Sequence, residues 1–426
     1  MSEPGHSLPS AGEPDAIIVG GGIGGLSCAV GLSLKGVRVR LYEKSAQFGE
    51  VGAGLQLAPN CTRILHAYGL LEEAVRLGVA PRRMRMLDAI EGGELTSLDL
   101  GDVEKRYGFP YLVMHRGDLH GLLLRAARRL GVDLITSAEA VGYANVGGGA
   151  RVRFADGGTD QAEVVIGADG LHSVARRLLI DDAPVSSAYV AYRGAVPFEA
   201  VAENEIFGDD VVVYIGPRCH FVQYPLRGGQ MFNQVAVFES PKARAGIEDW
   251  GTPDELDAAF EGKCPPVQKG LPLMWRDRWW RMFDRDPIMS FAKERIALLG
   301  DAAHPPLQYL AQGAIMAIED GWVLAEHVGA QGACRGGQRW AIDWDAVLAA
   351  YEAVRPAHCR RVVETARAWG NLWHLDGAKR EQRNAILRAR DTYDYSFVDW
   401  IFGPTALVPA QEPEHYQPIP LGPAGA

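Results

Sequence analysis

The glycine turn that runs from Gly20 to Gly25 constrains the fold of this chain more than any other feature of its sequence. It follows a short apolar run, Ala16 to Val19, and opens a stretch of small residues with helical character. Glycines with the spacing of Gly20, Gly22 and Gly25 permit a tight turn, close approach of a pyrophosphate and close helix packing. The free amides of the helix then face the phosphates. The turn therefore predicts a dinucleotide site.

Glu43 supports the same interpretation. It stands at the end of the next expected strand, Val37 to Tyr42. A carboxylate at this position accepts hydrogen bonds from a ribose 2′-hydroxyl and disfavours a 2′-phosphate.

Two later segments repeat the pattern of strand, Gly/Asp turn and helix, from Val165 to Arg176 and from Arg295 to Pro305. Between them, alternating strands separated by Gly and Pro turns predict a largely antiparallel sheet over 185–238. We therefore expect a discontinuous nucleotide domain over 15–80, 105–184 and 285–344, and a substrate domain over 81–104 and 185–284. A tail is expected over 1–14, and a helical region with a Pro-rich tail over 345–426.

Composition and charge exclude several classes of function. The net charge of −10 and the pI near 5.6 would repel a nucleic-acid backbone. The six cysteines are dispersed without metal-ligand spacing, which fits a reducing cytoplasm and predicts no metal site. The polar start of the chain has no signal-peptide pattern, and the apolar stretch Ile23 to Leu34 is too short to span a bilayer.

With these three motifs in this order, the sequence resembles the group A flavoprotein monooxygenases, the single-component FAD-dependent aromatic hydroxylases. The resemblance covers about Asp15 to His327. It implies an α/β fold: a Rossmann-like FAD-binding domain of the para-hydroxybenzoate hydroxylase and glutathione reductase type, with an inserted antiparallel sheet and C-terminal helices.

The resemblance also implies roles for individual residues around FAD. Asp301 would bind the ribityl chain, and Arg116 would contact the phosphate and ribityl region. Asp169 would brace a turn near the route of the nicotinamide. Main-chain amides at Gln312, Gly313 and Ala314 would stabilise negative charge on the reduced flavin. The glycine-rich segment from Gly49 to Asn60, with Ala53 and Gly54, would be a mobile loop beside the flavin.

No second dinucleotide turn follows a strand later in the chain. NADH or NADPH would therefore bind transiently as the electron donor, without a domain of its own, and the sequence does not choose between them. Molecular oxygen would be the other co-substrate.

By the same resemblance His220, Tyr224 and Gln308 would contact a small aromatic acid. Histidine can accept a phenol proton near neutral pH, while Gln308 and Tyr224 can orient or relay hydrogen bonds. A histidine in a strand is otherwise usually structural, and Tyr224 before a proline can be strand-end packing. Trp275, Trp279 and Trp280 are expected to pack between lobes, and three further apolar residues to form core: Met84, Met86 and Leu87.

The activity implied by the resemblance is NAD(P)H-dependent hydroxylation of a phenolic benzoate through a flavin hydroperoxide. The expected reaction converts 3-hydroxybenzoate to 2,5-dihydroxybenzoate, with salicylate or an aminohydroxybenzoate as alternative substrates. A flavin oxidase, a halogenase or a non-catalytic flavoprotein is the alternative class, although the Trp275 to Trp280 cluster lacks the halogenase Trp-x-Trp-x-Ile-Pro form. A homodimer is expected from the same resemblance.

Overall fold

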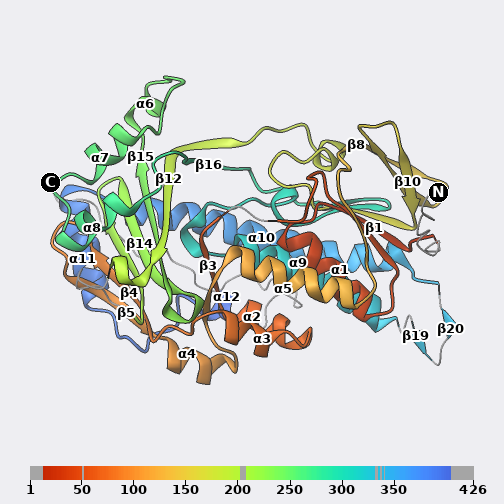
Figure 1. Cartoon of the computed structure of the whole chain (residues 1–426), viewed down its shortest axis with the longest axis horizontal. Coiled ribbons are helices and arrows are strands. Elements are labelled where there is room, and N and C mark those ends of the chain that lie inside the picture. The colour runs from red at the N-terminus through yellow and green to blue at the C-terminus, as the bar shows by residue number, and fades with distance from the viewer. Residues whose placement is uncertain are drawn as a thin grey trace, which may run out of the picture.

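A six-stranded sheet forms the nucleotide end of the molecule (Figure 1). The computed structural model describes residues 13–49, 52–201, 208–331, 334–335, 338–339 and 341–403. All neighbouring pairs in this sheet are parallel except β17 with β18. The strands, in spatial order, are β17 (Ala292–Lys293), β18 (Ile296–Leu298), β11 (Val164–Gly167), β1 (Ala16–Val19), β2 (Val39–Tyr42) and β7 (Asp133–Ile135).

Helices pack beside this sheet at close range. Helix α1 (Ile23–Leu34) contacts both α9 (Gly313–Ala330) and α5 (Arg116–Arg129). A Cβ on Gly321 would lie 2.6 Å from Cys28 Cα, so α9 approaches α1 more closely than a larger residue would permit. A small three-stranded sheet supplies a further apolar cluster with β1 and β11 and comprises β8 (Ala140–Val146), β9 (Gly149–Phe154) and β10 (Thr159–Ala162).

A seven-stranded sheet forms the other end of the molecule, and its strands come from two separate stretches of sequence. Neighbouring strands are antiparallel except the pair β13 and β4. In spatial order they are β16 (Trp280–Asp284), β12 (Val185–Pro197), β15 (Met231–Glu239), β14 (Cys219–Leu226), β13 (Val211–Gly216), β4 (Arg83–Asp88) and β5 (Glu94–Asp99).

Side chains of β14 alternate between two cores, as the period of a strand requires. Val222 and Tyr224 join the large cluster that continues to the nucleotide end, whereas Phe221 joins a cluster on the other face. Helices α6 (Pro241–Arg244), α7 (Pro253–Phe260) and α8 (Pro265–Gly270) follow β15 in the chain. Helix α7 begins with a capping box formed by Thr252 and Glu255.

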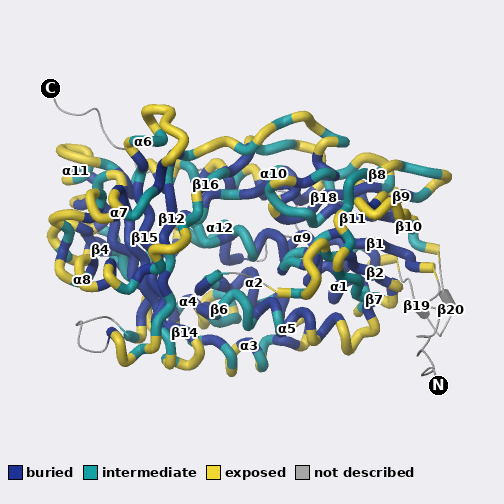
Figure 2. Tube along the Cα trace, turned by 45° about the horizontal axis from the view of Figure 1, so that its top comes forward, coloured by how far each residue is buried: buried dark blue, intermediate teal, exposed yellow. Residues whose placement is uncertain are grey.

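Helix α10 (Trp344–Trp373) is 30 residues long and runs between the two ends of the molecule (Figures 1 and 2). It packs on α9 and on the turn η6 (Gln308–Leu310). Helix α11 (Gly377–Arg388) then contacts β5, and α12 (Asp399–Phe402) contacts α2 (Pro59–Ala67). After residue 373 the chain therefore turns back onto the seven-stranded sheet and onto α2.

The remaining elements are short. They are β3 (Gly54–Leu57), α3 (Leu71–Leu77), α4 (Leu100–Tyr107), β6 (Leu112–His115), η1 (Ala175–Leu178), η2 (Phe198–Ala200), η3 (Arg227–Gly229), η4 (Leu271–Leu273), η5 (Gly300–Ala302), β19 (Cys334–Arg335) and β20 (Gln338–Arg339). No helix in the described part of the chain is long and apolar enough to cross a membrane.

Most expected elements form, and their ends move by a few residues. The strand expected from Val37 begins at Val39. The alternating strands expected over 185–238 include the 13-residue β12, which pairs with β16 from Val185 and with β15 from Tyr189 to Pro197. The tail over 1–12 and the Pro-rich tail after 403 lie outside the described residues.

Candidate active site

A cavity of about 680 Å³ extends from the glycine turn to the C-terminal helices. Its lining comes from the nucleotide end, from the inner face of the seven-stranded sheet, and from residues between Trp369 and Phe402. The cavity thus brings together side chains from most of the length of the chain.

The glycine turn cannot accommodate side chains at two of its positions. Gly20 has a φ of +116°, and a Cβ there would lie 2.1 Å from the Ala168 carbonyl oxygen. A Cβ on Gly25 would lie 1.9 Å from the Gly20 carbonyl oxygen. Gly22 and Gly25 line the cavity, and Gly22 is the N-cap of α1 without a side-chain cap. The first turn of α1 therefore offers amides to an anionic ligand.

Glu43 is fixed at the end of β2 beside this turn. Its Oε2 accepts the Gly21 amide and its Oε1 accepts the Ser45 amide, each at 2.8 Å. Burial acts to raise the pKa of Glu43, but these two amides outweigh it and the pKa lies below its ordinary value. The carboxylate is therefore ionised at neutral pH and can accept further hydrogen bonds from a ribose.

The glycine-rich segment lies between Arg116 and Tyr224. The Arg116 amide donates to the Ala53 carbonyl oxygen at 2.9 Å, and a Cβ on Gly52 would lie 3.0 Å from Arg116 Cδ. A Cβ on Gly54 would lie 2.4 Å from the Tyr224 ring. Arg116 and Gly54 line the cavity, whereas Ala53 is buried behind them. Glu50 and Val51 of this segment lie outside the described residues.

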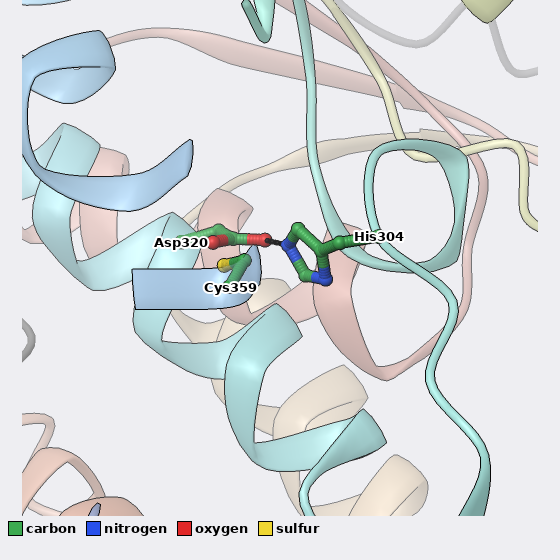
Figure 3. A group of neighbouring side chains, drawn as sticks. All are labelled: His304, Asp320 and Cys359. Atoms are coloured by element: carbon green, nitrogen blue, oxygen red, sulfur yellow. Dashed lines mark hydrogen bonds and ion pairs between the residues drawn. The ribbon is translucent and has the colours of Figure 1, made fainter. Parts of the chain in front are cut away.

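Asp301 lines the cavity at the turn η5, and a buried carboxylate holds that turn. Asp320 Oδ2 accepts the Gly300 amide at 2.8 Å and lies 2.7 Å from His304 Nε2 (Figure 3). Because Gly300 has a φ of +60°, a glycine suits the turn that presents Asp301 to the cavity.

His304, Asp320 and Cys359 have potential ligand atoms within 4.8 Å of one another (Figure 3). The fully buried Arg355 already occupies the place of a cation, with Nε 2.7 Å from Asp320 Oδ1 and Nη1 3.0 Å from Glu319 Oε2. Although burial opposes it, Asp320 raises the pKa of His304 well above its ordinary value, so that ring is protonated and a poor ligand. The group is a buried ion network.

The Gln312 side chain bonds to a buried side chain of the protein, whereas the next two residues, Gly313 and Ala314, face the cavity. Asn60 Nδ2 donates to Gln312 Oε1 at 3.0 Å and to Glu319 Oε1 at 2.8 Å. Gly313 and Ala314, at the start of α9, line the cavity, and this helix has no side-chain cap. Their amides can therefore stabilise negative charge on a bound ring.

Asp169 braces the turn after β11. Its Oδ2 accepts the amides of Val174 and Ala175 at 2.8 and 3.2 Å, and the Tyr143 hydroxyl at 3.2 Å. Ala168 and Gly170 line the cavity but Asp169 does not, so its geometry suits bracing, and direct contact with a cofactor stays a prediction.

His220, Tyr224 and Gln308 all line the cavity. His220 and Tyr224 lie on the same face of β14, and Gln308 begins η6. Gln308 Nε2 lies 3.4 Å from His220 Nε2, and both His220 and Tyr224 are buried. The structure therefore brings together the three residues that the sequence selected for substrate contact.

The sequence predicts that His220 titrates near neutral pH, but in the structure its surroundings shift its pKa. Burial, and next the neighbouring His374, lower the pKa of His220 well below its ordinary value. Burial likewise raises the pKa of Tyr224 above that of an ordinary tyrosine. Both rings are therefore neutral at pH 7, and His220 has a lone pair available for a proton.

Arg193 of β12 was missed by the sequence analysis. It lines the cavity and lies over the Trp280 ring, 5.5 Å from its centroid. In the described part of the chain no carboxylate pairs with its guanidinium, and burial lowers its pKa. The Tyr-Arg-Gly sequence at 192–194 contained no signal beyond a cation in an otherwise apolar strand.

The C-terminal residues that line the cavity were also missed, because they carry no motif. Trp369, Trp373, Arg390 and Trp400 are among them. His374, directly after α10, lies behind this lining, with Nε2 2.9 Å from His220 Nδ1. Only the tertiary packing of α10 on η6 brings this histidine to β14.

Two expectations for apolar residues require correction. Trp280 does more than pack between lobes, because it lines the cavity beside Arg193, while Trp279 stacks on Tyr192. Met84 and Met86 are partly buried against the large core cluster and also line the cavity, since β4 joins the sheet beside β13, whereas Leu87 is buried in the core.

The order of groups along the cavity fits FAD. Uncapped amides of α1 suit an ADP moiety, and the ionised Glu43 is fixed beside this turn, outside the cavity lining. Arg116 and Asp301 suit the diphosphate and ribityl chain, and the amides at Gly313 suit the ring system. When bound, FAD supplies electron transfer from a nicotinamide and activation of oxygen.

The comparisons with known proteins agree with this geometry. The model of the FAD binding domain family matches residues 13–366. A protein named 3-hydroxybenzoate 6-hydroxylase, from Polaromonas naphthalenivorans (strain CJ2), is 35% identical over 392 residues, covering 91% of this chain and 95% of that protein. A protein named 3-amino-4-hydroxybenzoate 2-monooxygenase, from Streptomyces cremeus, is 36% identical over 396 residues, covering 92% and 95%.

Solved structures have the same fold. HpxO of Klebsiella pneumoniae, complexed with FAD and uric acid, is 28% identical with a TM-score of 0.76, covering 88% of this chain and 92% of that one. A salicylate hydroxylase substrate complex is 24% identical with a TM-score of 0.74, covering 92% and 95%, and shows the fold alone.

The fold and the cavity define a flavoprotein oxidoreductase. The chain belongs to the FAD binding domain family, and within it to the FAD-dependent aromatic-ring monooxygenases. FAD is its cofactor, and NAD(P)H and oxygen are its co-substrates.

Proposed function

We propose that this enzyme hydroxylates 3-hydroxybenzoate to 2,5-dihydroxybenzoate, para to the existing hydroxyl. The observation that carries this proposal is the presence, in one cavity, of a neutral histidine beside an amide, His220 with Gln308, and of the cation Arg193. A hydroxybenzoate presents the matching pair of groups, a phenol that must lose its proton and a permanent carboxylate.

In this proposal His220 Nε2 accepts the phenol proton, which makes the ring carbon para to the oxygen nucleophilic. Gln308 orients the phenol oxygen, and the apolar walls formed by Met84, Met86 and Trp280 exclude water. The Tyr224 hydroxyl donates a hydrogen bond to the substrate.

Arg193 binds the substrate carboxylate in this proposal. A guanidinium without an anionic partner is costly inside a protein, and a bound carboxylate would offset that cost with charge-assisted hydrogen bonds. Trp280 holds the guanidinium over its ring and so fixes the place of the charge.

The relatives support the choice of substrate and also define the main alternative. Three relatives at 35–36% identity carry the name 3-hydroxybenzoate 6-hydroxylase, and the Streptomyces relatives carry the name 3-amino-4-hydroxybenzoate 2-monooxygenase. An aminohydroxybenzoate or salicylate is therefore the second candidate substrate.

One panel tests these candidates. The purified holoenzyme is mixed with NADH or NADPH and with 3-hydroxybenzoate, salicylate or 3-amino-4-hydroxybenzoate, and products are identified by mass and NMR. We expect 2,5-dihydroxybenzoate to form fastest, from 3-hydroxybenzoate. A faster reaction on another acid would replace the substrate, and nucleotide oxidation that yields only hydrogen peroxide would reject hydroxylation of these acids. The same assays decide between NADH and NADPH.

Sheet membership supports the proposed division into a nucleotide domain over 15–80, 105–184 and 285–344, and a substrate domain over 81–104 and 185–284.

A homodimer remains a proposal from the family resemblance. Size-exclusion chromatography with light scattering measures it directly.

A further inference from the structure

His374 is a second histidine at the substrate end, and it touches His220 instead of the cavity. Its Nε2 lies 2.9 Å from His220 Nδ1, the two ring planes are within 19° of each other, and His374 does not line the cavity. It is held by the amide of Arg218, which donates to its carbonyl oxygen at 3.2 Å, and by Tyr189, whose ring is 4.6 Å away and nearly parallel.

The hydrogen bonds around this pair assign both tautomers. An amide nitrogen only donates, so Gln308 Nε2 donates to His220 Nε2, which must carry a lone pair. The single proton of neutral His220 is then on Nδ1 and is donated to His374 Nε2. The proton of His374 is consequently on its own Nδ1.

The groups around the two histidines disfavour a positive charge on either ring. The groups that face these rings are Tyr189 of β12, Tyr309 of η6, Trp373 at the end of α10 and Arg383 of α11, and none of them is negative. Burial, and next Arg383, lower the pKa of His374 to about 3. A proton taken from the substrate would therefore be passed on, and the 8% of His374 that stays exposed gives it a path to water.

We propose that His374 is a positioning and proton-relay residue for His220, an inference that rests on the proposed phenol hydroxylation. It holds His220 in the tautomer whose Nε2 carries a lone pair. Gln308 donates to that lone pair in this structure, and the phenol takes the place of the amide when the substrate binds. When the phenol O–H bond breaks, an N–H bond forms at His220 Nε2, the Nδ1 proton of His220 moves to His374 Nε2, and the Nδ1 proton of His374 passes to water.

Two variants separate orientation from relay. His374→Gln can place an amide oxygen where Nε2 stood, so it still accepts from His220 Nδ1 but passes no proton on. His374→Phe keeps a ring against Tyr189 and accepts nothing. In single turnovers at pH 7 we expect His374→Phe to hydroxylate about 100-fold more slowly than the wild type, and His374→Gln about tenfold more slowly. His327→Gln, in α9 and away from the cavity lining, is the matched control and should keep the wild-type rate.

The pH profile distinguishes a relay from a structural role. A phenol ionises in solution near pH 10, at about the ordinary value for tyrosine, so the defect of His374→Phe should shrink as pH rises towards 10. An unchanged rate, or a defect that is the same at every pH, would overturn the relay. If the wild type hydroxylates no phenolic benzoate, the proposed function fails instead.

A measurement without substrate tests the tautomer assignment by itself. Nitrogen-15 NMR of histidine-labelled holoenzyme, assigned with the His374 variants and His220→Asn, should show His220 protonated on Nδ1 and unprotonated on Nε2 at pH 7. His220 protonated on Nε2 would overturn the proposal whatever the substrate is.

Discussion

The nucleotide end and the substrate end of the cavity are built in different ways. At the nucleotide end the main chain determines the site: side chains are excluded at Gly20 and Gly25, and helix amides face the cavity. At the substrate end side chains determine it, and those of Arg193, His220 and Gln308 come from three separate elements. Backbone requirements leave a pattern in the sequence within a few residues, whereas convergent side chains leave none until the chain is folded.

The sharpest test of this difference is Gly25→Ala. The new Cβ would lie 1.9 Å from the Gly20 carbonyl oxygen, so the turn must move. We expect the variant to retain no FAD on purification and to lose more than about 3 kcal/mol of unfolding free energy. Gly121→Ala in α5 is the control, because its Cβ meets only the end of the flexible Arg125 side chain, at 3.2 Å. A Gly25→Ala protein with normal FAD content would show that the turn is not required.

His220→Asn tests the substrate end with the next largest effect. Asparagine keeps polarity but cannot accept the phenol proton as an imidazole does, so single-turnover hydroxylation should slow about 1000-fold. FAD content should match the wild type, because His220 belongs to the substrate sheet. Loss of FAD from this variant would mean that the two ends are not separate.

Arg193→Met tests whether the carboxylate is recognised. Removing the guanidinium should raise KM for 3-hydroxybenzoate about 10- to 100-fold, the range for losing a charge-assisted hydrogen bond. The effect should disappear with 3-hydroxybenzyl alcohol, which has the same ring and no carboxylate. Equal losses on both compounds would assign Arg193 a packing role.

We expect the smallest effect from a change in the buried ion network, and that effect is on the unfolding free energy at acid pH. The pKa values of Glu319 and Asp320 are each about 2, although burial acts to raise both. Arg355 and His358 outweigh burial at Glu319, and His304 and Arg355 outweigh it at Asp320. Each folded value lies below its unfolded value, so the unfolded chain binds more protons as pH falls from about 4.5 to 2, and stability is lost in that window. Asp320→Asn should make the slope of unfolding free energy there shallower by up to about 1.4 kcal/mol per pH unit. Denaturant unfolding at several pH values measures this slope, and an unchanged slope would contradict the assignment.

The sequence predicted the fold, the FAD end and three of the substrate-end residues, the last through family resemblance. It could not predict Arg193, because an arginine in a strand does not indicate which face of that strand borders a cavity. It could not predict His374 either, since the heptad-like pattern of buried residues in α10 indicates only that one face of the helix packs against the rest of the protein. The contact between His374 and His220 spans 154 positions and depends on where a 30-residue helix ends.

Trp280 and Met86 show a related limit. Both are partly buried against the core cluster, and apolar residues at strand spacing do not distinguish a core from the wall of a cavity. The distinction required the pairing of β4 with β13 and of β16 with β12.

We infer that this cavity directs oxygen onto a phenolic benzoate, and labelled oxygen gas traces the atom that is transferred. The holoenzyme is given NADH or NADPH and 3-hydroxybenzoate under oxygen-18 gas, and both the product mass and hydrogen peroxide are measured. We predict 2,5-dihydroxybenzoate carrying one oxygen-18 atom, with about one nicotinamide oxidised for each product formed. Nicotinamide oxidation that yields hydrogen peroxide and no labelled aromatic product would contradict the claim.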